Sequence, residues 1–168
     1  MAARGTDGLT YICADGSLHG TPDEWGRQAV RLYDRWDADQ IVGEVNNGGD
    51  MVGFTVRECA KGLHREGERQ APHVPYTPVR ASRGKLTRAE PISAIYRQDQ
   101  VKHIGLYTDL EDQMTSWVPG EKSPDRLDAL VWALTALLIY GSPEIETWGG
   151  PSDDRKESYV RDVVKEQG

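Results

Sequence analysis

The chain has 168 residues, of which 38% are hydrophobic and 28% are charged. This composition is typical of a globular protein, and the length suits one domain with a sizeable core. The net charge of −7 argues against a protein that coats nucleic acid without specificity. Because no apolar run reaches the roughly 20 residues of a membrane span and no signal-peptide core follows the first residues, we expect a soluble, intracellular protein without a membrane partner.

Strand and helix signals alternate along the chain. A capping box at Thr21 and Glu24 predicts an amphipathic helix that runs to about Trp36. Strands are predicted over 9–14, 40–45, 76–81 and 101–104, further helices over 51–61, 86–98, about 110–117 and 124–140, and a loop over 62–75. The alternation favours an α/β fold with helices on the faces of a sheet. We expect one domain over residues 1–140 and a polar C-terminal tail over 141–168.

The last predicted helix begins with acids and continues with apolar residues. Ser123 is a good N-cap and Pro124 suits the first helical position, so Asp125 and Asp128 fall in the first turn. Residues three apart are neighbours on a helix surface, so both carboxylates could bind one divalent cation. Alternatively, the two acids only interact favourably with the helix dipole.

A third acid, Glu44, ends a predicted strand of Ile and Val residues. A carboxylate in such a strand is costly unless a cation or another partner neutralises it, although Glu44 could also reach solvent or pair with an arginine. Nearby, Asp50 follows a glycine turn, and we expect it to cap the next helix, the alternative being that it lends a carboxylate to the site. Acids that converge from a strand end and a helix start are typical of two-metal phosphodiester chemistry with Mg²⁺ or Mn²⁺.

A basic segment over 80–88 stands out in this acidic chain. It contains Arg83, Lys85 and Arg88 at the junction of a predicted strand and helix, where backbone N–H groups are also free to bind phosphate. The pattern of a phosphate-binding nucleotide loop is absent, so no ATPase is implied. We expect this segment to contact DNA, the alternative being a solvated loop that pairs with acids such as Glu90.

Other reactive side chains show no site-like spacing. We expect Cys13 and Cys59 to be free thiols and Glu111 to be solvated on its helix. The four histidines are expected at the surface or in turns: His19, His64, His73 and His103.

Four segments in this order resemble the C-terminal nuclease domain of tailed-phage terminase large subunits. They are Glu44-Val45-Asn46-Asn47-Gly48-Gly49-Asp50, Ser82-Arg83-Gly84-Lys85 with Arg88-Ala89-Glu90-Pro91, Leu110-Glu111-Asp112-Gln113-Met114, and Ser123-Pro124-Asp125-Arg126-Leu127-Asp128-Ala129-Leu130-Val131-Trp132-Ala133. The resemblance covers roughly residues 9–140.

The resemblance implies a ribonuclease H-like mixed sheet flanked by helices, and an endonuclease that cuts concatemeric viral DNA with two Mg²⁺ or Mn²⁺ ions. Carried over by position, Glu44, Asp125 and Asp128 would be the catalytic metal ligands, and Arg83, Lys85 and Arg88 would contact double-stranded DNA. By resemblance, the partners would be the terminase ATPase domain, the small terminase subunit and the portal, in the cytoplasm of a bacterial host.

The chain departs from the family pattern at its N-terminal end. Family members begin this domain with a strand that carries the first catalytic aspartate, whereas residues 10–17 align best with the third strand. We therefore expect the first strand or strands to be missing. In a second register, Asp15 stands at the end of the first strand and takes the role of that aspartate.

Three functions remain open from the sequence. The first is a metal-dependent DNA endonuclease, and the second is a catalytically incomplete module of the same fold that binds DNA or the packaging motor. The third is an unrelated α/β domain, in which Glu44 and Asp125 would lie far apart.

Overall fold

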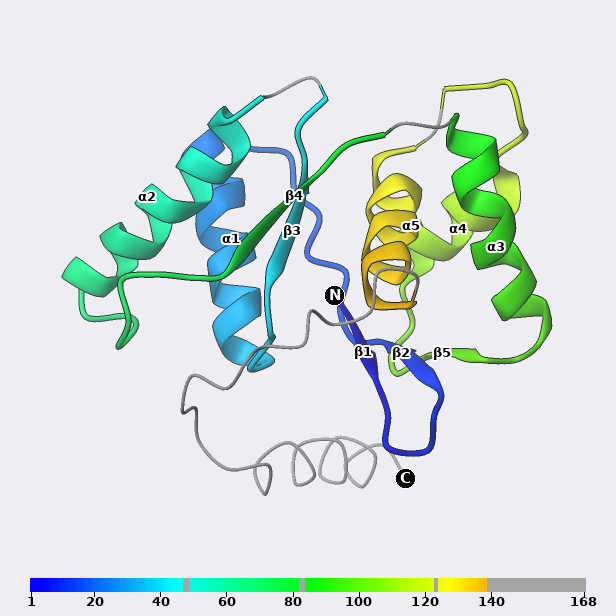
Figure 1. Ribbon diagram of the computed structural model, residues 1–168, viewed down its shortest axis with the longest axis horizontal. Coiled ribbons are helices and arrows are strands. Elements are labelled where there is room, and N and C mark those ends of the chain that lie inside the picture. The colour runs from blue at the N-terminus through cyan, green and yellow to red at the C-terminus, as the bar shows by residue number, and fades with distance from the viewer. Residues whose placement is uncertain (47–48, 82–83, 123, 139–168) are drawn as a thin grey trace. The chain divides into compact units, whose positions relative to one another are not determined.

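The computed structural model describes residues 1–46, 49–81, 84–122 and 124–138. They form two compact parts, which we call the α5 part (Met1–Ala14 and Arg88 onward) and the α1–α2 part (Asp15–Thr87). The elements, labelled in Figure 1, are β1 (Ala2–Arg4), β2 (Thr10–Ile12), α1 (Pro22–Arg35), β3 (Ile41–Glu44), α2 (Met51–Arg65), β4 (Tyr76–Val79), α3 (Lys85–Arg97), β5 (Val101–His103), α4 (Thr108–Ser116) and α5 (Asp125–Leu138). The predicted tail over 141–168 lies outside the described residues.

The α5 part contains a mixed sheet with the strand order β1-β2-β5. Strand β1 lies beside β2 (Figure 1) and is antiparallel to it. Strand β2 is parallel to β5, with Ile12 opposite His103. The parallel pairing places the carboxyl ends of β2 and β5 at the same edge, so His103 marks that edge. Strand β1 was not predicted, because its three residues, Ala2–Arg4, are too few to show an alternating pattern.

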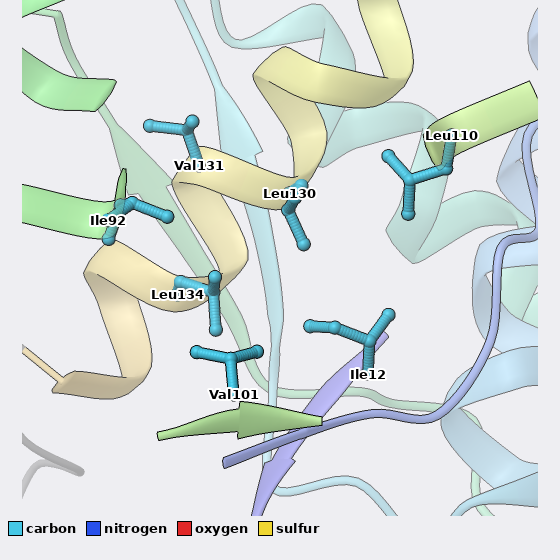
Figure 2. Close-up of a cluster of buried hydrophobic side chains, with 7 residues drawn as sticks. All are labelled: Ile12, Ile92, Val101, Leu110, Leu130, Val131 and Leu134. Atoms are coloured by element: carbon cyan, nitrogen blue, oxygen red, sulfur yellow. The ribbon is translucent and has the colours of Figure 1, made fainter. Parts of the chain in front are cut away.

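The core of the α5 part forms around helix α5. Figure 2 shows side chains from α5, from α3 and α4, and from strands β2 and β5 gathered in one cluster. The buried members are Ile12, Ile92, Val101, Leu110, Leu130, Val131 and Leu134. Leu134 is 0% exposed. Because so much of α5 is buried, its apolar body needs neighbours on several sides, as its sequence predicts.

The α1–α2 part pairs β3 and β4 in parallel and packs helix α1 against α2. Its buried cluster comes from both helices and from the segment before β4: Val30, Val56, Cys59, Ala60, Leu63 and Val74. Gly43 in β3 leaves room for the ring of Tyr76, because a Cβ atom at this position would lie 2.9 Å from a ring carbon. Tyr76 packs against the same cluster.

Most predicted elements are confirmed, and so is the α/β class. The capping box of α1 is present, since the Thr21 hydroxyl accepts from the Glu24 N–H and the Glu24 carboxylate accepts from the Thr21 N–H. The loop predicted over 62–75 is wrong in its first residues, because α2 continues to Arg65 and buries Leu63. Among the helices of the described ranges, none is both long and apolar enough to span a membrane.

Replacing Leu134 by Ala is expected to lower the free energy of unfolding by about 2–5 kcal/mol, because the cavity left in the core can collapse only partly. Urea unfolding followed by circular dichroism measures the change. The control is Leu106→Ala, since Leu106 is 83% exposed and its replacement should change stability by less than about 0.5 kcal/mol. Equal effects of the two substitutions would contradict the assigned core.

Candidate metal and DNA site

Helix α5 begins at the two acids that the sequence singles out. Asp125 is exposed, and Asp128 is partly buried one turn further along. The Asp128 N–H donates to the Pro124 carbonyl at 3.0 Å, so the helical hydrogen bonding begins in this turn. The predicted N-cap Ser123 lies outside the described residues. Both carboxylates therefore belong to the first turn, on neighbouring positions of the helix surface.

Two side chains of helix α4 contact the start of α5. The Gln113 side-chain oxygen accepts from the N–H groups of Arg126 and Leu127, at 3.2 and 3.3 Å. In addition, the Arg126 guanidinium lies 2.9 Å from the Asp109 carboxylate. Leu127 packs against the core cluster beneath. The turn that carries Asp125 and Asp128 is thus held from α4 and from the core.

Glu44 is the last residue of strand β3 in the α1–α2 part. It is partly buried and lies opposite Val79 of β4 in the parallel ladder. Because side chains alternate along a strand, Glu44 shares a face with Val42, whereas Ile41 on the other face packs against the α1–α2 cluster. The carboxylate is thereby directed to the face of β3 opposite the helices.

Shortly after Glu44, the Asn46 side chain contacts the backbone that follows strand β4. The Asn46 side-chain oxygen accepts from the Ala81 N–H at 3.2 Å, and its amide nitrogen lies 3.5 Å from the Ala81 carbonyl. Asp50 occupies the N-cap position of α2, but its side chain makes no capping hydrogen bond. The predicted capping role of Asp50 is therefore wrong, because its own backbone is already helical, with φ −72° and ψ −8°.

The three basic residues chosen for DNA contact differ in their surroundings. Arg83 lies outside the described residues, and Lys85 is exposed at the first position of α3. Arg88 is partly buried, with its guanidinium carbon 4.4 Å from the centroid of the Trp132 ring in α5, a cation–π contact. Its Nε and Nη1 atoms are buried and have no hydrogen-bond partner among the described residues. Stacking on Trp132 therefore fixes the direction of this cation.

A hydrogen-bonded group that the sequence analysis missed joins α3, β5 and α4. The His103 ring lies 2.9 Å from the Tyr96 hydroxyl through Nε2 and 2.9 Å from the Glu111 carboxylate through Nδ1. The expectation of a surface His103 is wrong, since only 14% of its side chain is exposed, and Glu111 is not simply solvated. Burial raises the pKa of the Tyr96 hydroxyl, so it remains a neutral hydrogen-bonding group. Spacing could not reveal this group, because its members come together only through packing.

The donor chemistry of these acids suits a hard divalent cation. Asp125 and Asp128 offer carboxylate oxygens, the ligands that Mg²⁺ and Mn²⁺ prefer. Within the described residues of each part, no group of three or more histidine, cysteine, aspartate or glutamate side chains is placed to hold a metal. The first turn of α5 thus supplies two carboxylates that could serve as ligands, fewer than a complete metal site needs.

Helices alternate with short strands in both parts, so the fold is of the α/β class. A family model for the terminase RNaseH-like domain matches residues 17–137, and the chain belongs to this family. This makes it a terminase nuclease-type domain. The match includes Glu44, Asp125 and Asp128, whereas Asp15 precedes it. Comparisons with curated proteins and with solved structures returned no match.

Because Glu111 contacts His103, we expect the protein to lose stability in acid. Hydrogen bonds from His103 and then from the Tyr107 N–H hold the pKa of Glu111 below its usual range. Glu111 therefore contributes stability above its unfolded-state pKa of about 4.3, and this contribution is lost as the pH falls through the lower folded-state pKa. In urea unfolding, Glu111→Gln should flatten the dependence of stability on pH in this acid range.

The control for this prediction is Asp112→Asn, which removes an exposed carboxylate from the same helix. Its pH dependence should stay close to that of the unsubstituted chain. If Glu111→Gln has no larger effect than Asp112→Asn, the contact with His103 does not contribute to stability in solution.

Proposed function

We propose that this chain is a metal-dependent DNA endonuclease domain of a phage or prophage terminase large subunit, which cuts concatemeric DNA during genome packaging. The observation that carries the proposal is the match to the terminase RNaseH-like family over 17–137, because it includes all three acids chosen for their chemistry. The apolar body of α5 beneath two of these acids supports it further, since it holds them in place.

In this proposal Glu44, Asp125 and Asp128 hold Mg²⁺ or Mn²⁺. When bound, a pair of such ions supplies an activated water and stabilises the leaving oxygen of a phosphodiester. The acids supply the oxygen ligands. Gly43 allows β3 to pass close to Tyr76, which supports the strand that carries Glu44.

The proposed DNA contacts are made by Arg83, Lys85 and Arg88. Phosphate contacts position a duplex without reading its sequence, so little sequence preference is expected. Lys85 contributes an exposed charge at the N-terminus of α3, where the helix dipole also favours phosphate. Arg88 contributes a guanidinium whose direction is set by Trp132.

The proposed partners follow from the same family. Double-stranded DNA is the substrate, and the terminase ATPase domain, the small terminase subunit and the portal are the expected neighbours in a packaging motor. Asp15 remains a candidate for a further metal-binding carboxylate; its side chain accepts from the Ser17 N–H at 3.0 Å.

Nicking of supercoiled plasmid tests the endonuclease. We expect nicking in Mn²⁺ or Mg²⁺ and none in EDTA. Glu44→Ala and Asp125→Ala should each lower the rate by more than about 10- to 100-fold, the range seen even for residues that only support metal ligands. Gel electrophoresis of the relaxed and linear products measures the rate.

Matched controls are Glu90→Ala on α3 and Asp112→Ala on α4, which remove exposed carboxylates. Both should nick at the rate of the unsubstituted chain. Absence of nicking by folded protein would overturn the enzyme proposal and leave a DNA-binding or motor-binding module of the same fold. If the controls also lose nicking, the effect does not depend on the positions of Glu44 and Asp125, and their assignment as metal ligands is contradicted.

The salt dependence of DNA binding tests the basic segment independently of cleavage. In EDTA, Lys85→Ala should weaken binding to duplexes of any sequence and reduce the slope of log K against log salt by about 1. Fluorescence anisotropy at several salt concentrations measures the slope. The control Lys61→Ala removes a lysine that pairs with Glu58 on α2, and an equal change in its slope would contradict the assigned contact.

A further inference from the structure

The first turn of α5 has backbone donors that its own helix cannot satisfy. The N–H groups at the start of any helix lack a carbonyl one turn earlier. In α5, two of them belong to Arg126 and Leu127, and both donate to the single side-chain oxygen of Gln113. These two amides lie between Asp125 and Asp128. A contact from another helix therefore satisfies the backbone of the turn that carries both acids.

Helix α4 is itself held at a second point. Glu111, two residues before Gln113, binds His103 at the end of strand β5. Leu110, on the same helix, is 4% exposed in the core cluster. The start of α5 is thus linked through α4 to the edge of the sheet, and the ion pair between Asp109 and Arg126 adds another link.

We propose that Gln113 is a positioning residue of the metal site: its contact with the Arg126 and Leu127 amides holds Asp125 and Asp128 in the arrangement that binds the divalent cation. This inference rests on the proposed function, since it concerns the same acids. Gln113 reaches the acids through the backbone between them. Without its oxygen the N–H groups of Arg126 and Leu127 would lose this contact with α4, and the first turn would fray more readily, so each carboxylate would be held less firmly in its direction.

The experiment compares Gln113→Met, which keeps the length of the side chain but removes the oxygen, with Gln113→Glu, which keeps an acceptor. Amide hydrogen exchange by NMR should become about fivefold faster at residues 126 and 127 in Gln113→Met, as expected for a lost N-cap interaction. Calorimetric titration with Mn²⁺ in the absence of DNA should show a dissociation constant raised by about tenfold. In Gln113→Glu, the exchange rate at residues 126 and 127 and the dissociation constant for Mn²⁺ should both stay close to those of the unsubstituted chain.

Nicking kinetics separate positioning from a merely structural role. The Mn²⁺ concentration for half-maximal nicking should rise in Gln113→Met, while the rate at saturating Mn²⁺ stays near that of the unsubstituted chain. Gln98→Met, which replaces an exposed glutamine after α3, is the control and should change neither quantity. A Gln113→Met protein that folds stably but is impaired equally at all Mn²⁺ concentrations would overturn the positioning role.

The outcomes distinguish this inference from the function on which it rests. If the unsubstituted chain binds Mn²⁺ with the expected dependence on Gln113 but does not nick DNA, the endonuclease proposal fails and the positioning role stands. If it nicks DNA and Gln113→Met leaves Mn²⁺ binding unchanged, the positioning role fails alone. If it does not bind Mn²⁺, both are overturned.

Discussion

Helix α5 cannot turn about its axis without exposing its apolar body to water. Leu130, Val131 and Leu134 are buried against strands β2 and β5 and helices α3 and α4 (Figure 2). A rotation by one residue would move each of them by about 100° on the helix surface and replace its contacts. The direction of Asp125 and Asp128 is therefore set by the packing of residues further along the same helix. Hydrophobic burial thus determines where the charged turn faces.

Polar contacts between elements add to the hydrophobic packing around α5. The Gln113 side chain caps α5, and Glu111 on the same helix binds His103. Each bond satisfies a group that is costly to leave unpaired where solvent is limited. Arg88 differs, because its charge lies on the Trp132 ring while two of its nitrogens have no hydrogen-bond partner in the part of the chain that the structure describes. The aromatic face of Trp132 thus takes the place of hydrogen-bond acceptors beside this cation.

Local patterns predicted the elements well and the polar contacts poorly. The capping box at Thr21 and Glu24 was predictable because both partners lie within four residues of each other. The roles of His103 and Glu111 were not, since their contact requires β5 and α4 to pack together. The Gln113 cap is a contact of the same kind, between side chain and backbone of different helices. At Asp50 the local pattern led to a wrong prediction, because aspartate favours capping but this residue has a helical backbone conformation and makes no capping hydrogen bond.

The sequence by itself determined the α/β alternation, the buried body of α5 and the two acids in its first turn, because each depends on spacing within one segment. It also indicated the family, through four motifs in a fixed order. Only the tertiary structure decided which side chains hold that first turn and that His103 belongs to a hydrogen-bonded group. Such contacts join residues from different elements, and the distances between elements come from packing, which no local pattern records.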